Sequence, residues 1–516
     1  CTALESVNFS TWKLAATDNA LTADEMFQGC ANLVTVGVGS GWRQATIKDN
    51  TTMFLGCTKI VGADDTHYQA SDATPGARKF AHYGTVGGVG GYLSANSIWG
   101  DVYWSLNGEG NLTLTPTNGV TGNLQGFKTT GKDESAAGDG ASHLPPWYVC
   151  RENVRTFSIA PGVASVGVDL NADGTQGWLS SMFEGCTNLT SVDFDRFSTS
   201  NAVNMMRFFY GCEGLATINN MNFETLAVTN MTSMFDGCDS LTRLSVSSFD
   251  TSNVTEMTYM FADCDNLATI EFGAGFSPVS VNNMQGMFAN NPELNALDLS
   301  SFNTYAVTEM QEMFMNCSKL SSVDLTFFAV ESVTDMRNMF AGCTALSTID
   351  LTMFDPQSCQ SMEGMFEGCT GLTSIQLPAR YNTFSLTNMK AMLKGCTALT
   401  GINLTSFDVS NVTTFEQTFS GCSSIESIDL YTWRLKTGTG VVDAGNMFLN
   451  CSSLKTIYIG DDWNAASIKA TDTMFLGCVA LVGADGTKYQ GGKTSPTPGN
   501  KNYAYVGSPS LHDSSL

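Results

Sequence analysis

Cysteine is the residue type whose number and spacing first suggest chemistry in this sequence. The chain holds 16 cysteines, and most of them occupy one place in a repeated unit with steps of mainly 26 or 27 residues. A single cysteine per unit predicts a buried column of small apolar side chains, with neighbours about 5 Å apart. Parallel side chains fit disulfide geometry poorly, and no Cys-x-x-Cys pair or paired histidine favours zinc. The column comprises Cys186, Cys212, Cys238, Cys264, Cys317, Cys343, Cys369, Cys396, Cys422, Cys451 and Cys478, with Asn291 in its vacant place.

Residues suited to catalysis are scarce. The four histidines, His67, His82, His143 and His512, all lie outside the main run of repeats. The sequence has no hydrolase, metalloprotease, P-loop or dinucleotide-binding motif, and no EF-hand loop. We therefore predict a protein that is not an enzyme and has no cofactor. Two cysteines are out of register: Cys359 takes a core valine position, whereas Cys150 has no partner that the sequence identifies.

Composition and charge exclude several classes of function. The 516 residues carry 25 Lys+Arg against 49 Asp+Glu, a net charge of −24, and 43% of them are hydrophobic. The hydrophobic share is sufficient for a folded core. The acidity argues against binding to nucleic acids or to anionic membranes. No apolar run is long enough to predict a transmembrane segment.

Each repeat contains the elements that position its cysteine. Leu244 and Val246 alternate with outward residues, which predicts a short strand. A polar cluster follows, suited to a turn and a helix N-cap. The spacing of Val254, Met257 and the apolar residues up to Cys264 then predicts one face of a short helix. Because no unit can bury its apolar face alone, the units must stack into a right-handed α/β solenoid with a parallel sheet on one side.

The repeats resemble a known family. Residues 249–261, Phe-Asp-Thr-Ser-Asn-Val-Thr-Glu-Met-Thr-Tyr-Met-Phe, and the recurrent Met-Phe-x-Gly-Cys are similar to the BspA-like leucine-rich repeats, the 26-residue repeat of bacterial surface proteins. The resemblance covers roughly three quarters of the chain. It implies a leucine-rich-repeat solenoid in a secreted or wall-attached, extracellular protein used in adhesion. It transfers no catalytic residue.

The repeat register predicts four segments. Residues 1–92 match the last units and cap of a first module, because Cys1, Cys30 and Cys57 are spaced like Cys422, Cys451 and Cys478. Residues 93–175 form a connector and N-terminal cap, with a β-hairpin across Val102 to Leu114. Residues 176–490 form a second solenoid with its own cap, and residues 491–516 resemble a linker. The chain thus begins inside a repeat, which we interpret as part of a longer protein, although a lipidated Cys1 is the alternative.

The outward strand positions form the one surface feature that suggests a binding site. In-register parallel strands would place these side chains in a ladder, where like charges about 5 Å apart repel by roughly 1 kcal/mol at high dielectric. The ladder is either a solvated surface helped by neighbouring hydroxyls or an acidic recognition face for basic proteins, with Ca²⁺ bridging as a further option. The predicted face comprises Asp193, Glu271, Asp298, Asp324, Asp350, Asp429 and Tyr458.

Two functions remain open on this basis. The first is a bacterial adhesin that binds host matrix proteins, cell-surface proteins or glycoproteins through the strand face. The alternative is a self-assembling fibre, stalk or surface layer whose partners are copies of itself.

Overall fold

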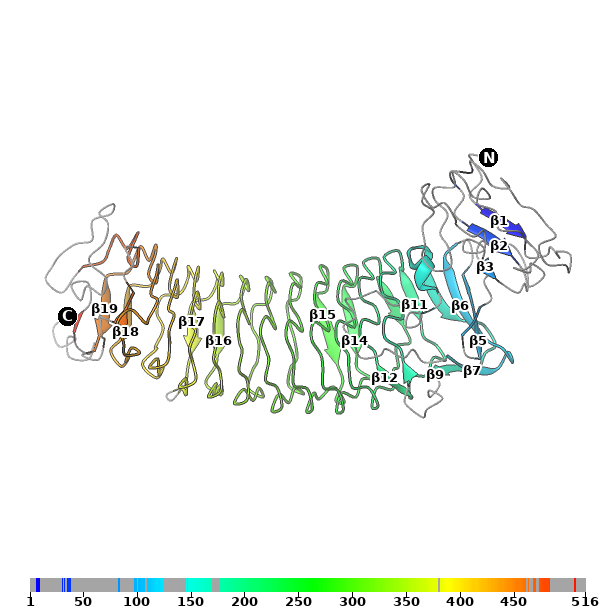
Figure 1. Cartoon of the computed structure of the whole chain (residues 1–516), viewed down its shortest axis with the longest axis horizontal. Helices are drawn as coiled ribbons and strands as arrows, with labels where there is room; N and C mark the ends of the chain where they lie inside the picture. The colour runs from blue at the N-terminus through cyan, green and yellow to red at the C-terminus, as the bar shows by residue number, and fades with distance from the viewer. Residues whose placement is uncertain are drawn as a thin grey trace. The chain divides into compact units, whose positions relative to one another are not determined.

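A computed structural model defines the architecture of the chain in two compact units, residues 1–227 and 228–516 (Figure 1). It describes residues 101–106, 109–124, 147–168, 177–378, 381–460, 467–469 and 473–482. It also describes short pieces at 6–9, 35–38, 82–83, 97–99 and 505–506, and residues 30, 32, 145 and 463. Among these residues, no helix has both the length and the hydropathy needed to cross a membrane.

Unit 1 contains three kinds of sheet. A parallel three-stranded sheet has the order β1-β2-β3, and a six-stranded sheet has the order β13-β11-β8-β6-β5-β4. Two small parallel pairs, β7 with β9 and β10 with β12, complete it. The strands are β1 Ser6–Phe9, β2 Thr35–Val38, β3 His82–Tyr83, β4 Ser97–Trp99, β5 Val102–Leu106, β6 Asn111–Pro116, β7 Thr121–Leu124, β8 Thr156–Ile159, β9 Ser165–Val168, β10 Gly177–Trp178, β11 Ser191–Asp193, β12 Ala202–Asn204 and β13 Thr217–Asn219, with a 3-10 helix at Tyr148–Asn153.

The hairpin predicted in the connector is present and caps the first repeats. β5 and β6 pair antiparallel, with Trp104 opposite Leu114. β6 then pairs parallel with β8, and β8 with β11, so the hairpin continues the sheet of the repeats. Trp147 is fully buried, and its indole N–H donates to the carbonyl oxygen of Met182 at 2.9 Å. The hairpin and this tryptophan thereby cover an edge of the sheet that would otherwise be unpaired.

Unit 2 is a stack of repeat coils joined by parallel pairing (Figure 1). One side carries the strand pairs β14 with β15 and β16 with β17, and the sheet β18-β19-β20. The opposite turn of each coil carries a single-residue bridge to the next coil, in an unbroken series from Asn230 to Asp443. The strands are β14 Arg243–Val246, β15 Thr269–Phe272, β16 Thr348–Asp350, β17 Ser374–Gln376, β18 Ser427–Leu430, β19 Thr456–Ile459 and β20 Tyr505–Val506.

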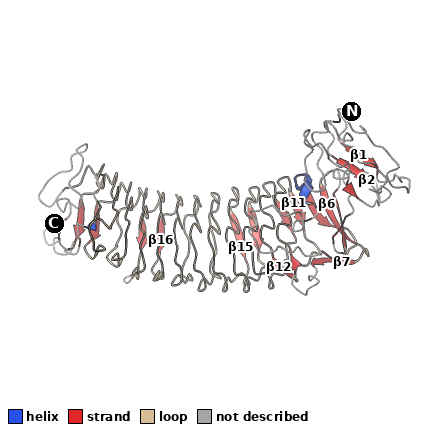
Figure 2. Ribbon diagram, in the orientation of Figure 1, coloured by secondary structure: helices blue, strands red, loops and turns tan. Residues whose placement is uncertain are grey.

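The short helix predicted for each repeat is not found in the described coils between residues 228 and 460, which consist of strands, bridges, turns and irregular backbone (Figure 2). The backbone N–H groups of Met257, Tyr259 and Phe261 donate instead to carbonyl oxygens of the next coil, at 2.9–3.2 Å. A helix would need those N–H groups for bonds within its own coil. The predicted apolar face is nevertheless correct: Val254, Met257, Met260, Phe261 and Cys264 are all fully buried. Tight turns that recur every three residues bury nearly the same positions as a helical turn.

Two residues per coil adopt the left-handed backbone conformation that helices exclude. One lies three residues after the bridge, as at Tyr259 with φ 53° and Glu312 with φ 64°. The other directly precedes the column cysteine, where Gly, Asn or Asp stands, as at Gly395 with φ 77° and Asn316 with φ 61°. Glycine and asparagine tolerate this region best, which explains the recurrent Gly-Cys and Asn-Cys pairs.

The cysteines form the buried column that the spacing predicts. The described cysteines of the column, like Cys359, are buried and free of disulfide bonds. The thiol of Cys343 donates to the carbonyl oxygen of Phe314 in the preceding coil at 3.1 Å, and Cys317, Cys369 and Cys478 repeat the contact at 2.9–3.1 Å. Each thiol therefore joins two coils as well as filling the core. Cys1 and Cys57 lie outside the described residues, as does the side chain of Cys150.

Phenylalanines form a second column beside the thiols. Phe261, Phe288, Phe314 and Phe340 stack on one another with centroids 5.3–5.7 Å apart and planes within 10° of parallel. Offset stacking of buried rings adds to the gain from burial alone. The repeat distance between coils is thereby supported by side chains as well as by the backbone.

Asn291 replaces the column cysteine by inserting its amide between two coils. The side-chain NH₂ donates to the carbonyl oxygens of Phe261 and Phe288 at 2.6 and 2.8 Å. The side-chain oxygen accepts from the backbone N–H of Cys264 at 3.0 Å. Asn291 is fully buried, so all three of its contacts replace water that the site excludes.

The first prediction concerns this asparagine. Asn291→Asp keeps the shape but sets a carboxylate against two carbonyl oxygens, and we expect a loss of about 3–5 kcal/mol in unfolding free energy. Asn291→Cys restores the residue of the other coils and should cost about 1 kcal/mol or less. Urea denaturation followed by circular dichroism measures both. Equal stability of the Asp variant and the wild type would contradict the bonding described here.

The second prediction concerns the left-handed position at Gly395. A Cβ there would meet only the backbone of Gly368 at 3.6 Å, an ordinary contact, so the backbone conformation decides the outcome. Gly395→Val should lose about 2 kcal/mol, because a β-branched residue is poorly tolerated at positive φ. Gly395→Asn, the residue found at this place in Asn316 and Asn450, should lose less than about 1 kcal/mol. The same denaturation assay compares them, and equal losses would indicate steric crowding instead.

The two ends of the chain carry sheets of the same design. β1 pairs with β2 from Ser6 opposite Thr35, and β18 pairs with β19 from Ser427 opposite Thr456. A third strand, β3 or β20, pairs parallel with each. β20 lies in the segment predicted to be a linker, so at least part of that segment completes a sheet. The predicted boundaries of the four segments fall largely outside the described residues and stay predictions.

Candidate functional site: the strand face of unit 2

The structure brings four of the predicted site residues together on consecutive coils. Glu271 lies in β15 and Asp350 in β16, and Asp298 and Asp324 take the equivalent positions in the two coils between them. All four side chains are exposed. We call the surface formed by Glu271, Asp298, Asp324 and Asp350 the acidic strand face.

The other three predicted residues lie apart from this group. Asp429 in β18 and Tyr458 in β19 are paired neighbours further along unit 2, and both are half-buried. Asp193 lies in β11 of unit 1 and is also half-buried. The seven residues therefore do not form one site.

Each aspartate of the acidic strand face stabilises its own turn. Its Oδ1 accepts the backbone N–H of the residue two positions on, at 3.1 Å for Asp298, 2.9 Å for Asp324 and 2.8 Å for Asp350. The hydroxyl and then the backbone N–H of that residue, a Ser or Thr, hold the pKa of each carboxyl below its ordinary value. Repulsion from Asp324 raises the pKa of Asp298 and of Asp350, but by less. The carboxylates are thus ionised at neutral pH.

A second polar ladder, which the sequence analysis missed, runs along the single-residue bridges. In most coils the side chain at the bridge accepts the backbone N–H two residues on, as Asn283 does from Gln285 at 2.9 Å and Asp335 from Arg337 at 3.0 Å. We call this surface the bridge face. Its usual signal in the sequence is a polar residue that follows Val-Thr or Val-Asn, as at Val254-Thr255-Glu256 and Val281-Asn282-Asn283. The ladder comprises Asn230, Glu256, Asn283, Glu309, Asp335, Ser361, Asn388, Thr414 and Asp443.

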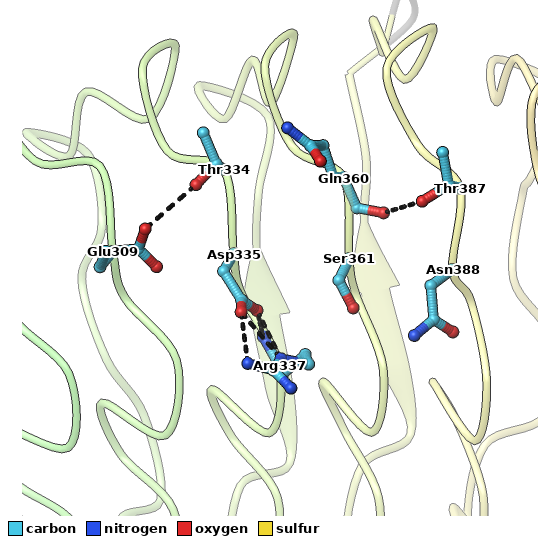
Figure 3. Close-up of a pocket in the computed structure, with 8 residues that line it drawn as sticks. All are labelled: Glu309, Thr334, Asp335, Arg337, Gln360, Ser361, Thr387 and Asn388. Atoms are coloured by element: carbon cyan, nitrogen blue, oxygen red, sulfur yellow. Dashed lines mark hydrogen bonds and ion pairs between the residues drawn. The ribbon is translucent and has the colours of Figure 1, made fainter.

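Part of the charge on and beside the bridge face is compensated by ion pairs within the chain. Arg337 pairs with Asp335 at 2.7 Å, Lys390 with Glu416 at 3.1 Å, and Lys469 with Asp443 at 3.3 Å. A hollow of about 330 Å³ lies here, and Figure 3 shows Arg337 folded against Asp335 within it. Thr334 donates to Glu309 in the same hollow. Its polar groups therefore already bond to one another.

The acidic strand face differs from the bridge face in its ion pairs. Among the described residues, none of its four carboxylates forms an ion pair with a Lys, Arg or His. A hollow of about 300 Å³ lies on it, lined by Asp324 and Asp350 together with Thr326, Thr352 and Met353. This part of the surface therefore carries charge that the described residues do not neutralise.

The described residues provide neither a metal site nor a reactive thiol. No three His, Cys, Asp or Glu side chains among them gather in a way that would hold a metal ion. Burial raises the pKa of the Cys317 and Cys369 thiols to about 12, so these cysteines stay protonated at neutral pH.

A known family model matches the repeat region of the chain. The family model described as "Mycoplasma protein of unknown function, DUF285" matches residues 178–272, 274–377 and 373–485, which together exceed half of the chain. The chain belongs to this family. Its description carries no function, and it does not name the BspA-like repeats, so that resemblance stays a prediction. No curated protein matches the chain.

Solved structures similar to the chain include bacterial leucine-rich-repeat proteins. A leucine-rich cell surface protein from Faecalibacterium prausnitzii A2-165 is 18% identical, covering 77% of this chain and 94% of its own, with a TM-score of 0.36. A leucine-rich repeat protein from Eubacterium ventriosum is 16% identical, covering 78% and 97%, with a TM-score of 0.33. The pneumococcal vaccine antigen PcpA is 13% identical, covering 70% and 92%, with a TM-score of 0.27.

The third prediction concerns the hydrogen bonds of the carboxylates. Thr326→Val removes the hydroxyl that bonds to Asp324 and should raise the pKa of Asp324 toward its ordinary value near 4. Thr352→Val should do the same for Asp350 alone. Side-chain carbon NMR of aspartate-labelled protein measures both carboxyls in each variant. Shifts of both carboxyls in either variant would mean that repulsion between coils dominates.

The lowered pKa of these carboxyls also sets how the free energy of unfolding changes with pH. A carboxyl whose pKa is lower in the folded chain than in the unfolded chain stabilises folding above the unfolded value. That contribution is lost as the pH falls through the lowered folded value. These turns should therefore weaken only below about pH 4.

Proposed function

We propose that this protein is a non-enzymatic cell-surface protein that binds other proteins through the acidic strand face of unit 2. One observation supports the proposal most strongly. Two polar faces run along the same coils, but only the acidic strand face carries a run of exposed carboxylates without cationic partners in the described chain. Unneutralised charge on a rigid surface favours a partner of opposite charge.

The chemistry of the face defines the class of partner. Four carboxylates on consecutive coils attract basic protein segments and repel nucleic acids and anionic lipids. The net charge of −24 adds long-range attraction for basic partners. Host matrix or cell-surface proteins with exposed basic segments fit this description, and adhesion would then be the biological result.

The stacking of the coils suits binding over an extended surface. Each coil adds one rung at a fixed spacing, so a partner with regularly spaced cations would make several weak contacts at once. Exposed ion pairs contribute about 0.2–1 kcal/mol each, and several together give a useful affinity. Repetition of the module along a longer protein would add avidity.

The fourth prediction tests this assignment. Asp298→Asn, Asp324→Asn and Asp350→Asn together should weaken binding to a basic matrix protein about tenfold or more at physiological salt. The fold should survive, because Asn403 stands at the same position and its Oδ1 accepts the N–H of Thr405 at 3.1 Å. Surface plasmon resonance against a panel of matrix and cell-surface proteins measures the affinities.

A matched control removes the same charge from the other face. Glu256→Gln, Glu309→Gln and Glu363→Gln on or beside the bridge face should leave those affinities unchanged. Equal losses in both triple variants would mean that net charge, rather than the acidic strand face, governs binding.

Sedimentation of the wild-type protein alone tests the alternative of self-assembly. Concentration-dependent association of the wild type, without binding to any protein of the panel, would favour a structural surface layer instead.

A further inference from the structure

Two large apolar side chains are exposed beside the acidic strand face. Phe327 is 58% exposed and Met353 is 67% exposed, and they occupy the same position in consecutive coils, 26 residues apart. Their neighbours in sequence, Phe328 and Phe354, are buried as the repeat requires.

The repeat itself does not require apolar residues at this position. Several equivalent places in other coils hold small or polar residues, as at Ser248, Ser301 and Ser406. Large side chains that stay exposed in a folded protein are informative where they gather next to other features of a site. Here they gather on the two coils that also carry Asp324 and Asp350.

The hollow joins the apolar and acidic groups. Its wall includes Asp324, Asp350 and Met353 in a volume of about 300 Å³. That volume is at the lower end of ligand pockets, so it suits one or two side chains of a larger partner. The backbone N–H and the hydroxyl of Thr326 both donate to Oδ1 of Asp324, and the backbone N–H of Thr352 donates to Oδ1 of Asp350. The Oδ2 atoms of both aspartates can accept bonds from an incoming cation.

We propose that this hollow binds a polypeptide segment in which a Lys or Arg lies next to a bulky apolar residue. The cation would pair with Asp324 and Asp350, while the apolar side chain would cover Met353 and Phe327. Charge complementarity selects this occupant, since the residues that line the hollow include two aspartates and no Lys or Arg. The inference rests on the proposed function and names the chemistry of its partner.

The test uses the full chain and fluorescent peptides of repeating sequence. One peptide repeats Lys-Leu-Gly, a second repeats Lys-Ser-Gly with the same charge, and a third repeats Glu-Leu-Gly with the same apolar content. Fluorescence anisotropy at physiological salt measures the dissociation constants. The wild type should bind the Lys-Leu-Gly peptide most tightly and the Glu-Leu-Gly peptide least.

The deciding variant is Phe327→Ser with Met353→Ser, which installs the residue of neighbouring coils. It should weaken binding of the Lys-Leu-Gly peptide about tenfold and leave the Lys-Ser-Gly peptide unchanged. The control is Val279→Ser with Tyr305→Ser, which removes two side chains that are 41% and 75% exposed at another position of the repeat. This control should leave both affinities unchanged.

The outcomes separate the two proposals. If the Phe327 and Met353 variant binds like the wild type, while the triple Asn variant binds weakly, the hollow is not the apolar anchor and only this inference fails. If the triple Asn variant also binds both basic peptides like the wild type, the acidic strand face is not a binding surface and the proposed function fails. If the Val279 and Tyr305 control loses as much affinity for the Lys-Leu-Gly peptide, the apolar contact is nonspecific and this inference fails.

Discussion

Backbone hydrogen bonding between consecutive coils is the constraint on which the rest of this structure depends. Along the bridge face and the turns after it, alternate N–H groups donate to the next coil, as those of Tyr259, Phe261 and Asp263 do. Donors committed in this way are not available to a helix, so each coil closes through tight turns with left-handed residues. The coil length is then fixed, and equivalent positions of neighbouring coils lie side by side.

This fixed register forces like side chains into columns. In the core the result is favourable, because thiols donate to carbonyl oxygens of the preceding coil and phenylalanines stack. Asn291 shows what a polar residue needs in order to replace a cysteine of the buried column. Its side chain donates to two carbonyl groups and accepts from one N–H group. On the surface the same register sets carboxylates beside carboxylates, and the protein compensates through local hydrogen bonds that lower their pKa.

The sequence was sufficient to predict the features that depend on spacing alone. The cysteine column, the buried set from Val254 to Cys264 and the hairpin before the repeats all followed from periodicity and turn residues. The short helix was wrong, because apolar residues at intervals of three fit both a helical face and a series of tight turns. Only the left-handed residues, such as Asp263 and Gly395, distinguish the two, and their varied side chains conceal the pattern. The bridge face was missed for a similar reason: its positions hold Asn, Asp, Glu, Ser and Thr, which are all polar but share no residue type.

The contrast between the two faces also shows how much of the acidic strand face the fold itself requires. At most bridges the polar side chain accepts a hydrogen bond within its own turn, and cations pair with two of the bridge carboxylates, Arg337 with Asp335 and Lys469 with Asp443. On the strand face the aspartates serve their turns with one oxygen, and serine, threonine and alanine, not lysine or arginine, flank them. Asn403 shows that an uncharged amide performs the same turn task. The turn therefore accounts for a polar residue at Asp298, Asp324 and Asp350, but it does not account for their negative charge.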